Sequence, residues 1–580
     1  MKKILYTLIG ITGLSLASCD MDKYPYNEIP TDEALRTLSD FKNFRNGFYE
    51  YTQVLFTGSY VLQPEIQADG LNAVIDFSNT YGTWYRWQQT AEDGGQWSGF
   101  YALISNCNLV LEKGVSLMHT FSDADQITLK HYLGEAYFMR ALAYEELAIR
   151  FCKPYNASTA ANDLGVALVT KYAPSSQSST YPARSSLAKT YELITADLDS
   201  AAKYITTPGT QNSGYLTEDA VAALKARVAL QMKDYTAAIN AAKPLVDGDK
   251  YPLVTTAAAM RDMWTNDKST EVIFQPIFIS GQLGSATGTV LIDKSGSNTK
   301  VNPDFLPTKT VLDLYDQTND LRFAAYFKKG SMNFSSGSPQ LYYCSKYPGN
   351  PLYCTGNTQF INAPKILRIA EMYLILAEAY KESNDETNAL SYLNALRSKR
   401  IAGYTDQTYS GTALTNEIRK ERQRELWRTA FGDEEEVIDC FYQRCYRSED
   451  MLVLAEDGRI CTMLALLPME LVAPAGQSAS AWYVYALATD PDQRKKGFGR
   501  QLLHYADFYL RERLADCLTV VPAEPSLHRY FSTVGFQPCF ATRKLELLPA
   551  MISPANRADA LEQTGAAVYN RIREAQLEGG

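Results

Sequence analysis

The chain has 580 residues, of which 46% are hydrophobic and 21% are charged, and its net charge is −9. A chain of this length exceeds what one hydrophobic core usually supports, so we expect two or more domains. The acidic balance disfavours nucleic acid and anionic membrane surfaces as partners, because both attract positively charged proteins. The four histidines and ten cysteines form no CxxC pair or other metal-ligand spacing, so no metal site is predicted.

The N-terminus has the layout of a bacterial lipoprotein signal. Met1-Lys2-Lys3 is basic, residues 4–16 are hydrophobic, and Leu16-Ala17-Ser18-Cys19 matches a lipobox. The hydrophobic run is too short for a permanent membrane helix. We therefore expect residues 1–18 to be a signal peptide and Cys19 to carry lipid, with more than one acyl chain anchoring the protein firmly. An ordinary secretory signal with a coincidental cysteine is the alternative.

Residues 19–424 have the hydrophobic periodicity of a mainly α-helical domain. Residues 218–246 and 370–400 each read as two helices joined by a short turn, with alanines where the helices approach. This pattern is typical of tetratricopeptide-like repeats, which stack because one hairpin cannot bury both faces. A generic helical bundle fits the periodicity equally well. The Gly-, Ser-, Asn- and Pro-rich stretch 275–358 predicts long loops, which can form a binding pocket over a rigid scaffold.

Four ordered motifs in this domain resemble the SusD/RagB family. They are W-x-x-x-Y-x-x-I-x-x-x-N from Trp97 to Asn108, GEA-x-x-x-RA from Gly134 to Ala141, and the stretches Pro182–Leu198 and Arg368–Arg397. The resemblance implies an outer-membrane surface lipoprotein that captures oligosaccharides or other nutrients. It also implies a partner, a TonB-dependent transporter of SusC type, over which the protein forms a lid.

Three aromatic residues, Trp84, Tyr85 and Trp87, crowd into a loop flanked by Gly and Thr. Flat aromatic faces can stack on the C–H side of pyranose rings, so these residues are candidates for glycan contact. Core packing is the alternative, and it is our expectation for the nearby motif residues Trp97 and Tyr101.

Two cysteines, Cys344 and Cys354, flank a stretch in which Pro348, Gly349 and Pro351 mark a turn. The two thiols could therefore meet across this turn. A disulfide there is plausible in an exported protein, and the sequence leaves the pairing open.

The pattern changes near residue 425, where the SusD-like closing segment is absent. Residues 426–439 predict a fresh amphipathic helix, and residues 452–464 predict a hairpin across Asp457-Gly458. A strand at 482–488, a helix from 500 to about 514 and a strand at 518–521 follow. We expect an α/β domain with a mixed sheet over 425–548, and a helical tail over 549–580.

The segment between the predicted strand and helix, Arg494 to Gly499, resembles the R-x-x-G-x-G motif of GNAT N-acetyltransferases. Glycines let the backbone approach a pyrophosphate, and a helix N-terminus adds positive partial charge. The resemblance implies that acetyl-CoA lies on the preceding strand and on the amides of this loop. The implied cofactor-binding residues are Leu487, Thr489, Arg494, Lys495, Lys496, Gly497, Phe498 and Gly499.

The resemblance leaves the catalytic residues undecided. The family reaction is attack of an amine on the thioester, with a general acid protonating the departing thiolate. Many members use the Tyr of an L-Y-x-x-x-G-F motif, but here Phe531 stands at that position, with Tyr530 beside it. Tyr530 and Glu470 are the candidates for acid and base.

The two halves require different compartments, because acetyl-CoA is a cytosolic cofactor. Three explanations stay open: a fusion of two genes, natural or from sequence assembly; an exported protein whose tail is a binding or structural module; or a cytosolic acetyltransferase whose leader is misread. We expect nutrient capture at the outer membrane, joined to an acetyltransferase-like domain of doubtful activity. The alternative is an acetyl-CoA-dependent N-acetyltransferase. The sequence names neither the glycan nor the acetyl acceptor.

Overall fold

The structure is a computed structural model that describes the chain between residues 34 and 537, with gaps. The described ranges are 34–68, 70–88, 95–174, 177–278, 284–296, 300–354, 359–426, 451–456, 459–472, 478–489, 496–512, 515–520 and 525–537. The predicted signal peptide 1–18, Cys19, the predicted helical tail 549–580 and all but the first residue of the predicted helix 426–439 lie outside these ranges. None of the described helices combines the length and hydropathy needed to cross a membrane.

The chain folds as two compact units, each made of discontinuous segments. The first unit comprises Met1–Thr52, Trp97–Gly209 and Leu216–Val228, and the second comprises Gln53–Gln96, Thr210–Tyr215 and Ala229–Gly580. The helices wholly or mainly in the first unit are α2 (Leu38–Leu55), α5 (Gly95–Leu117), α6 (Asp123–Phe151), α7 (Leu187–Tyr204) and α8 (Glu218–Gln231), with short 3-10 turns at Met118–Thr120 and Ser178–Thr180.

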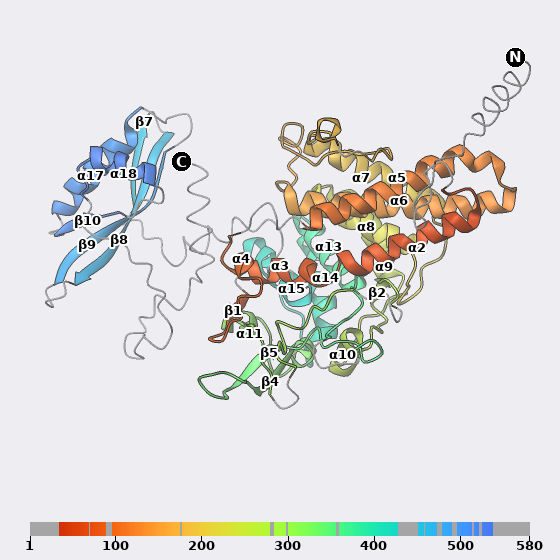
Figure 1. Cartoon of the computed structure of the whole chain (residues 1–580). Helices are drawn as coiled ribbons and strands as arrows, with labels where there is room; N and C mark the ends of the chain where they lie inside the picture. The colour runs from red at the N-terminus through yellow and green to blue at the C-terminus, as the bar shows by residue number, and fades with distance from the viewer. Residues whose placement is uncertain are drawn as a thin grey trace, which may run out of the picture. The chain divides into compact units, whose positions relative to one another are not determined.

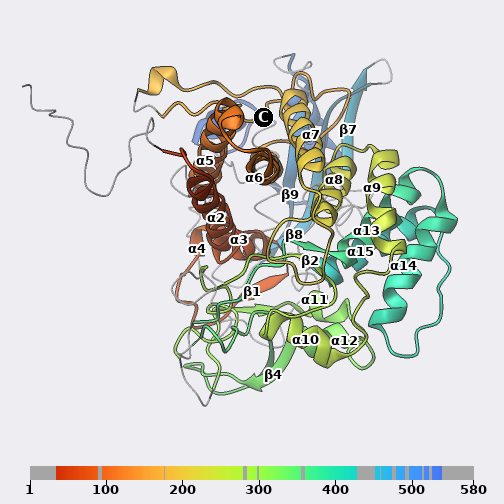
Figure 2. The ribbon, with the colours of Figure 1, turned by 90° about the vertical axis from the view of Figure 1, so that its right-hand side faces the viewer.

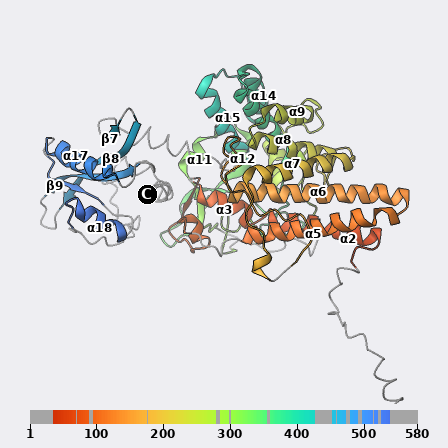
Figure 3. The same cartoon turned by 90° about the horizontal axis from the view of Figure 1, so that it is seen from above.

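Helix α6 is the centre of the first unit, as Figure 3 shows from above. Its N-cap is Ser122, whose side chain accepts a hydrogen bond from the Asp125 amide. Helix α7 packs closely on it at Gly134, where a Cβ atom would lie 2.8 Å from the Tyr204 Cβ and 2.9 Å from Ile205 Cγ1. This close approach explains the glycine of the GEA motif, because any larger residue would push the two helices apart.

The second unit combines helices with short strands in long loops. Its helices before the C-terminal sheet are α3 (Ser59–Gln67), α4 (Gly82–Tyr85), α9 (Tyr235–Asp247), α10 (Ala257–Thr265), α11 (Lys309–Asp313), α12 (Leu321–Tyr326), α13 (Ile369–Glu382), α14 (Glu386–Arg400) and α15 (Gly411–Leu426). Three antiparallel strand pairs accompany them: β1 (Leu71–Ala73) with β3 (Phe305–Pro307), β2 (Val272–Phe274) with β6 (Leu367–Arg368), and β4 (Phe327–Ser331) with β5 (Gln340–Cys344). Helices α9, α13, α14 and α15 lie together (Figure 2).

The two predicted repeats contain helices where the periodicity places them. The turn between the two helices has the same conformation in both repeats. Lys233 and Asn384 both adopt a left-handed conformation, with φ of 60° and 63°. Asp234 and Asp385 follow as N-caps, each accepting a backbone hydrogen bond of 3.0 Å from the residue three positions later. The prediction of tetratricopeptide-like helical repeats with long loops is confirmed.

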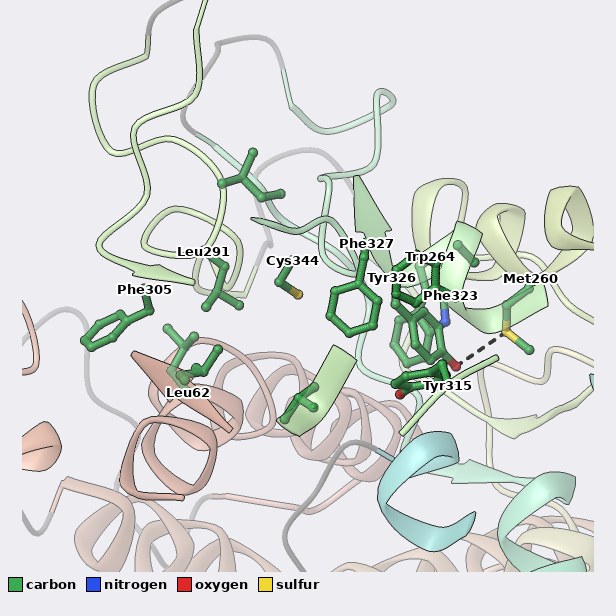
Figure 4. Packing of buried hydrophobic residues seen from close by; sticks show 14 of the residues in the cluster. Leu62, Met260, Trp264, Leu291, Phe305, Tyr315, Phe323, Tyr326, Phe327 and Cys344 are labelled. Carbon is green, nitrogen blue, oxygen red and sulfur yellow. Dashed lines mark hydrogen bonds between the residues drawn. The ribbon is translucent and has the colours of Figure 1, made fainter. Parts of the chain in front are cut away.

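An aromatic core of the second unit lies around α12 and the start of β4 (Figure 4). Tyr315, Phe323, Tyr326 and Phe327 pack edge to face or tilted, with ring centroids 5.4–6.4 Å apart. The buried Tyr326 hydroxyl donates to the Met260 sulfur at 3.6 Å. The predicted loop region 275–358 therefore supplies much of the core as well as surface.

The C-terminal part has a four-stranded mixed sheet in the order β10–β9–β8–β7. Strands β7 (Met451–Glu456) and β8 (Arg459–Val472) form the predicted hairpin, β9 (Ser478–Thr489) is antiparallel to β8, and β10 (Cys517–Thr519) is parallel to β9. Helices α17 (Phe498–Glu512) and α18 (Pro525–Thr533) pack on it (Figure 1). The predicted fold class is confirmed.

The suspected disulfide is absent from the structure. Cys344 and Cys354 are both free thiols. Cys344 is wholly buried, and burial raises its pKa to about 12. Cys354 lies at a local turn, where its sulfur accepts a 3.2 Å hydrogen bond from the Ile361 amide. The turn predicted from its prolines and glycine therefore does not bring the two sulfurs into a bond.

Candidate functional site

The motif residues of the first unit meet in a buried polar network. The Arg140 guanidinium donates two 2.8 Å hydrogen bonds to the Asp197 carboxylate and one of 2.7 Å to the Asn108 side-chain oxygen. Asn108 in turn donates to the Val169 carbonyl. Three motifs that are far apart in sequence thus fix α5, α6 and α7 together. Because these groups are buried and mutually satisfied, their role here is structural.

The aromatic cluster that we predicted as a glycan platform is partly core. Residues 82–85 form the short helix α4 and not a loop, and Tyr81 precedes it in a left-handed conformation with φ of 58°. Trp84 is only 8% exposed and stacks face to face on Tyr81 with a centroid distance of 4.3 Å. Trp84 therefore offers little surface to a sugar.

Tyr85 and Trp87 are half-buried and remain available as aromatic surface. The Tyr85 ring packs against Phe77 and Phe305, with centroid distances of 6.0 and 5.6 Å. Trp87 has a φ of 55°, and its indole N–H donates to the Gln67 carbonyl at 3.1 Å. These contacts hold both rings in place. Glycan contact in this cluster stays a prediction for these two residues.

The structure describes the last two residues of the predicted cofactor loop, Lys496 and Gly497, and the start of the helix that follows. Gly497 has a φ of 87°, and its carbonyl accepts the first hydrogen bond of α17 from Gln501. Lys496 and Gly497 are exposed, and Phe498 and Gly499 open the helix. Arg494 and Lys495 lie outside the described residues.

The hydroxyl of Tyr530 lies beside this loop. A Cβ atom on Gly499 would be 2.9 Å from the Tyr530 hydroxyl oxygen and 3.5 Å from the Thr489 Oγ1 atom. Partial burial raises the Tyr530 pKa, and Arg500 opposes that shift. Phe531 instead packs in the apolar core and is 7% exposed. The structure therefore brings Tyr530, Thr489 and Gly499 together, whereas Phe531, whose ring packs edge to face on that of Tyr530 at a centroid distance of 5.3 Å, belongs to the apolar core.

The other candidate, Glu470, lies elsewhere in the sheet. It pairs with Ser480 in the β8–β9 ladder, whereas Thr489 pairs with Thr462. Eight residues of strand separate Glu470 from Thr462, which is about 27 Å at the usual rise per residue. Glu470 thus does not share a site with Gly499.

Leu487, another predicted cofactor-binding residue, is partly buried and packs against the apolar core.

Comparisons with known proteins match both the helical part and the C-terminal α/β part of the chain. Residues 22–230 match the family model "Starch-binding associating with outer membrane", residues 333–428 match "SusD family", and residues 414–538 match "Acetyltransferase (GNAT) domain". The SusD-like protein P38 of Formosa agariphila is 28% identical over 277 residues, which cover 46% of this chain. The chain spans about half the length of this curated relative, 50%. The chain joins a SusD-like part to a GNAT-like part.

Solved structures match the SusD-like part in fold. A SusD superfamily protein from Bacteroides thetaiotaomicron is 25% identical, with a TM-score of 0.58, and the match covers 68% of this chain and 88% of that structure. A SusD-like carbohydrate binding protein from Bacteroides vulgatus is 18% identical, with a TM-score of 0.54 over 79% and 92% of the two chains. The surface glycan-binding protein A from Bacteroides fluxus is 19% identical, with a TM-score of 0.53 over 70% and 89%.

Residues 414–428 match both family models, and the described part of this segment packs with the SusD-like part. Helix α15 carries Glu421 and Glu425, which are 0% exposed. Glu421 pairs with Arg322 and Arg397, at 2.6 and 2.8 Å. The SusD-like part therefore extends at least to Leu426, two residues beyond the predicted boundary. The sequence places Glu421 and Glu425 at the end of the SusD-like pattern but does not show their arginine partners, which lie up to about 100 positions away.

Proposed function

We propose that the SusD-like part captures oligosaccharides at the outer membrane and passes them to a SusC-type TonB-dependent transporter. The observation that carries this proposal is the match to SusD-family models together with the SusD fold. The names of two structural relatives, a carbohydrate binding protein and a surface glycan-binding protein, support a sugar ligand. Lipid at Cys19 would hold the protein at the membrane.

The sugar contacts that we propose are Tyr85 and Trp87. Their rings are fixed by neighbours, as described above, so little side-chain freedom would be lost on binding. We expect Tyr85→Ala and Trp87→Ala each to weaken oligosaccharide affinity roughly tenfold, the loss expected from one aromatic stacking contact. The measurement is a glycan array with the wild-type protein, followed by calorimetry with the oligosaccharide that gives the strongest signal.

Tyr181→Ala is the matched control for these variants. Tyr181 is a 60% exposed tyrosine of the first unit, far in sequence from the cluster. Its replacement should leave affinity within twofold of wild type. Folding is checked for each variant by the unfolding midpoint. Unchanged affinity in both folded cluster variants would remove Tyr85 and Trp87 from the proposal, and an array with no bound glycan would contradict sugar capture itself.

A second function, acetyl-CoA binding by the GNAT-like part, is favoured by one observation. The Tyr530 and Thr489 hydroxyls lie around Gly499 at the start of α17, beside the loop that the family uses for the cofactor. Any side chain here would displace the Tyr530 hydroxyl, because a Cβ atom on Gly499 would lie 2.9 Å from that oxygen. We expect the full chain to bind acetyl-CoA in a calorimetric titration, with Gly499→Val reducing affinity at least tenfold. Absence of binding by the folded wild-type chain would contradict this function.

A further inference from the structure

An exposed arginine stands between the two aromatic residues that we propose for sugar contact. Arg86 ends α4, where its amide donates to the Gly82 carbonyl at 3.0 Å. Its Nη2 atom donates to the Asn79 side-chain oxygen at 2.8 Å, and its Nε atom donates to the Gln88 side-chain oxygen at 3.3 Å. These two hydrogen bonds hold the guanidinium in one place.

The backbone around Arg86 is strained. Asn79, Tyr81 and Trp87 all adopt left-handed conformations, with φ of 65°, 58° and 55°. Such conformations are unfavourable for bulky residues, persist where the surrounding contacts require them and often occur at binding sites. Gly82 belongs to the same arrangement, because a Cβ atom there would clash with the Asn79 side-chain oxygen and lie 2.7 Å from the Arg86 Nη2 atom. The loop is therefore shaped around the hydrogen bond between Asn79 and Arg86.

The charge of Arg86 is not neutralised by the residues that the structure describes. Both of its partners are uncharged amide oxygens, and no described carboxylate forms an ion pair with it. Two carboxylates of the adjoining loops are engaged elsewhere. Asp76 accepts hydrogen bonds from Ser335, and Asp304 pairs with Lys294. A fixed and exposed positive charge is thus present in a chain whose net charge is −9.

The guanidinium lies beside both proposed sugar contacts. Its partner Gln88 directly follows Trp87 in the chain. Its other partner, Asn79, lies two positions beyond Phe77, against which the Tyr85 ring packs at a centroid distance of 6.0 Å. An oligosaccharide that contacts either ring therefore comes close to a positive charge.

We propose that Arg86 binds the acidic group of a charged oligosaccharide, a uronic acid carboxylate or a sulfate ester, while Tyr85 and Trp87 contact its sugar rings. A guanidinium presents N–H groups in a planar fork that fits such oxyanions. The Nη1 atom makes no hydrogen bond to the described residues, so its N–H groups are available to the ligand. This inference rests on the proposed function, oligosaccharide capture, and names the class of oligosaccharide.

The test starts with a glycan array that carries neutral, carboxylated and sulfated oligosaccharides, probed with the full chain. We expect the strongest signal from an acidic member, and its identity distinguishes carboxylate from sulfate. Calorimetry then compares this oligosaccharide with its uncharged counterpart, made by reducing the carboxyl group or removing the sulfate. The wild-type chain should bind the acidic form at least tenfold more tightly, as expected of a charge-assisted hydrogen bond.

The variants separate the charge of Arg86 from its place in the loop. In Arg86→Gln the preference for the acidic form should fall below twofold, with affinity for the uncharged form within twofold of wild type. Arg86→Lys keeps the charge and should keep part of the preference. Arg511→Gln is the matched control, because it removes a positive charge from a 74% exposed side chain of the GNAT-like part, and it should keep the whole preference.

Four outcomes would contradict the inference. A neutral oligosaccharide as the strongest ligand, or an acid preference that survives in folded Arg86→Gln, would overturn it and leave sugar capture standing. Equal weakening of both forms in Arg86→Gln would assign Arg86 a merely structural role and also overturn it. An array with no bound glycan would contradict sugar capture itself, and the inference with it. Unfolding midpoints check folding, and if Arg86→Gln does not fold, the wild-type preference and its loss at high salt decide.

Discussion

Glu425 is a wholly buried carboxylate that meets three arginine side chains. Its oxygens lie 3.1, 3.0 and 2.9 Å from nitrogens of Arg322, Arg368 and Arg400. Burial raises the pKa of Glu425, but Arg400, Arg368 and Arg322 together lower it well below its ordinary value. Removing one partner of such a network costs more than the network contributes, because the remaining charges stay buried.

We expect Glu425→Gln to lower the free energy of unfolding by about 3 to 5 kcal/mol at pH 7, as for other broken buried ion pairs. The folded-state pKa of Glu425 is depressed, so its contribution is present above the unfolded pKa near 4.5 and is lost as pH falls. The difference between wild type and variant should therefore shrink below about pH 4.5. Urea unfolding of the full chain at pH 7 and pH 3.5 measures both effects.

Asp313→Asn is the control for this loss of charge. Asp313 pairs with Lys309 on the surface, and the two side chains are 50% and 87% exposed. Its replacement should change stability by less than about 1 kcal/mol, as for exposed ion pairs. If Glu425→Gln lowered the free energy of unfolding no more than the control does, the prediction would be wrong and the three arginines would have found other partners.

At the scale of elements, the same glutamates decide where α15 belongs. Two family models overlap on residues 414–428, and sequence similarity alone does not choose between them. Arginines on α12, α14 and β6 pair with the glutamates of α15, since a buried guanidinium requires a carboxylate partner. These ion pairs assign α15 to the SusD-like part. The GNAT-like strands begin at Met451, well beyond this helix.

Elements with strong local signals could be predicted, and their pairing could not. The Asp457-Gly458 hairpin and both repeat helix pairs follow from turn residues and periodicity. The Thr462–Thr489 pair depends on the register of β8 and β9, which contains an irregularity between Met463 and Ala465. A shift of one residue would place other side chains opposite Thr489. For the same reason the motif by itself does not show that Tyr530, and not Phe531, faces Gly499.

At the scale of the whole molecule, the predicted leader would determine which half functions where. Export would expose the SusD-like part to extracellular sugars, whereas acetyl-CoA is a cytosolic cofactor. We expect the wild-type chain to incorporate labelled palmitate and to sediment with membranes, and Cys19→Ala to lose both properties. Attached acyl chains account for the difference, since each buried methylene contributes about 0.8 kcal/mol.

Cys354→Ala is the control, because Cys354 is a free thiol within the SusD-like part. It should keep the palmitate label. A wild-type chain that remains unlabelled in the cytoplasm would contradict outer-membrane capture and would favour the acetyltransferase.

The sequence by itself determined the two family resemblances and the helical repeats, and the lipoprotein signal and the glycine loop stay predictions from it. Each of these depends on residues close together in the chain or on a fixed local spacing. Only the tertiary structure showed that Trp84 is buried, that Cys344 and Cys354 are unpaired, and that Glu470 lies far from Gly499. These facts depend on which distant segments pack together. Burial and partnership are set by the whole core, and no local pattern encodes them.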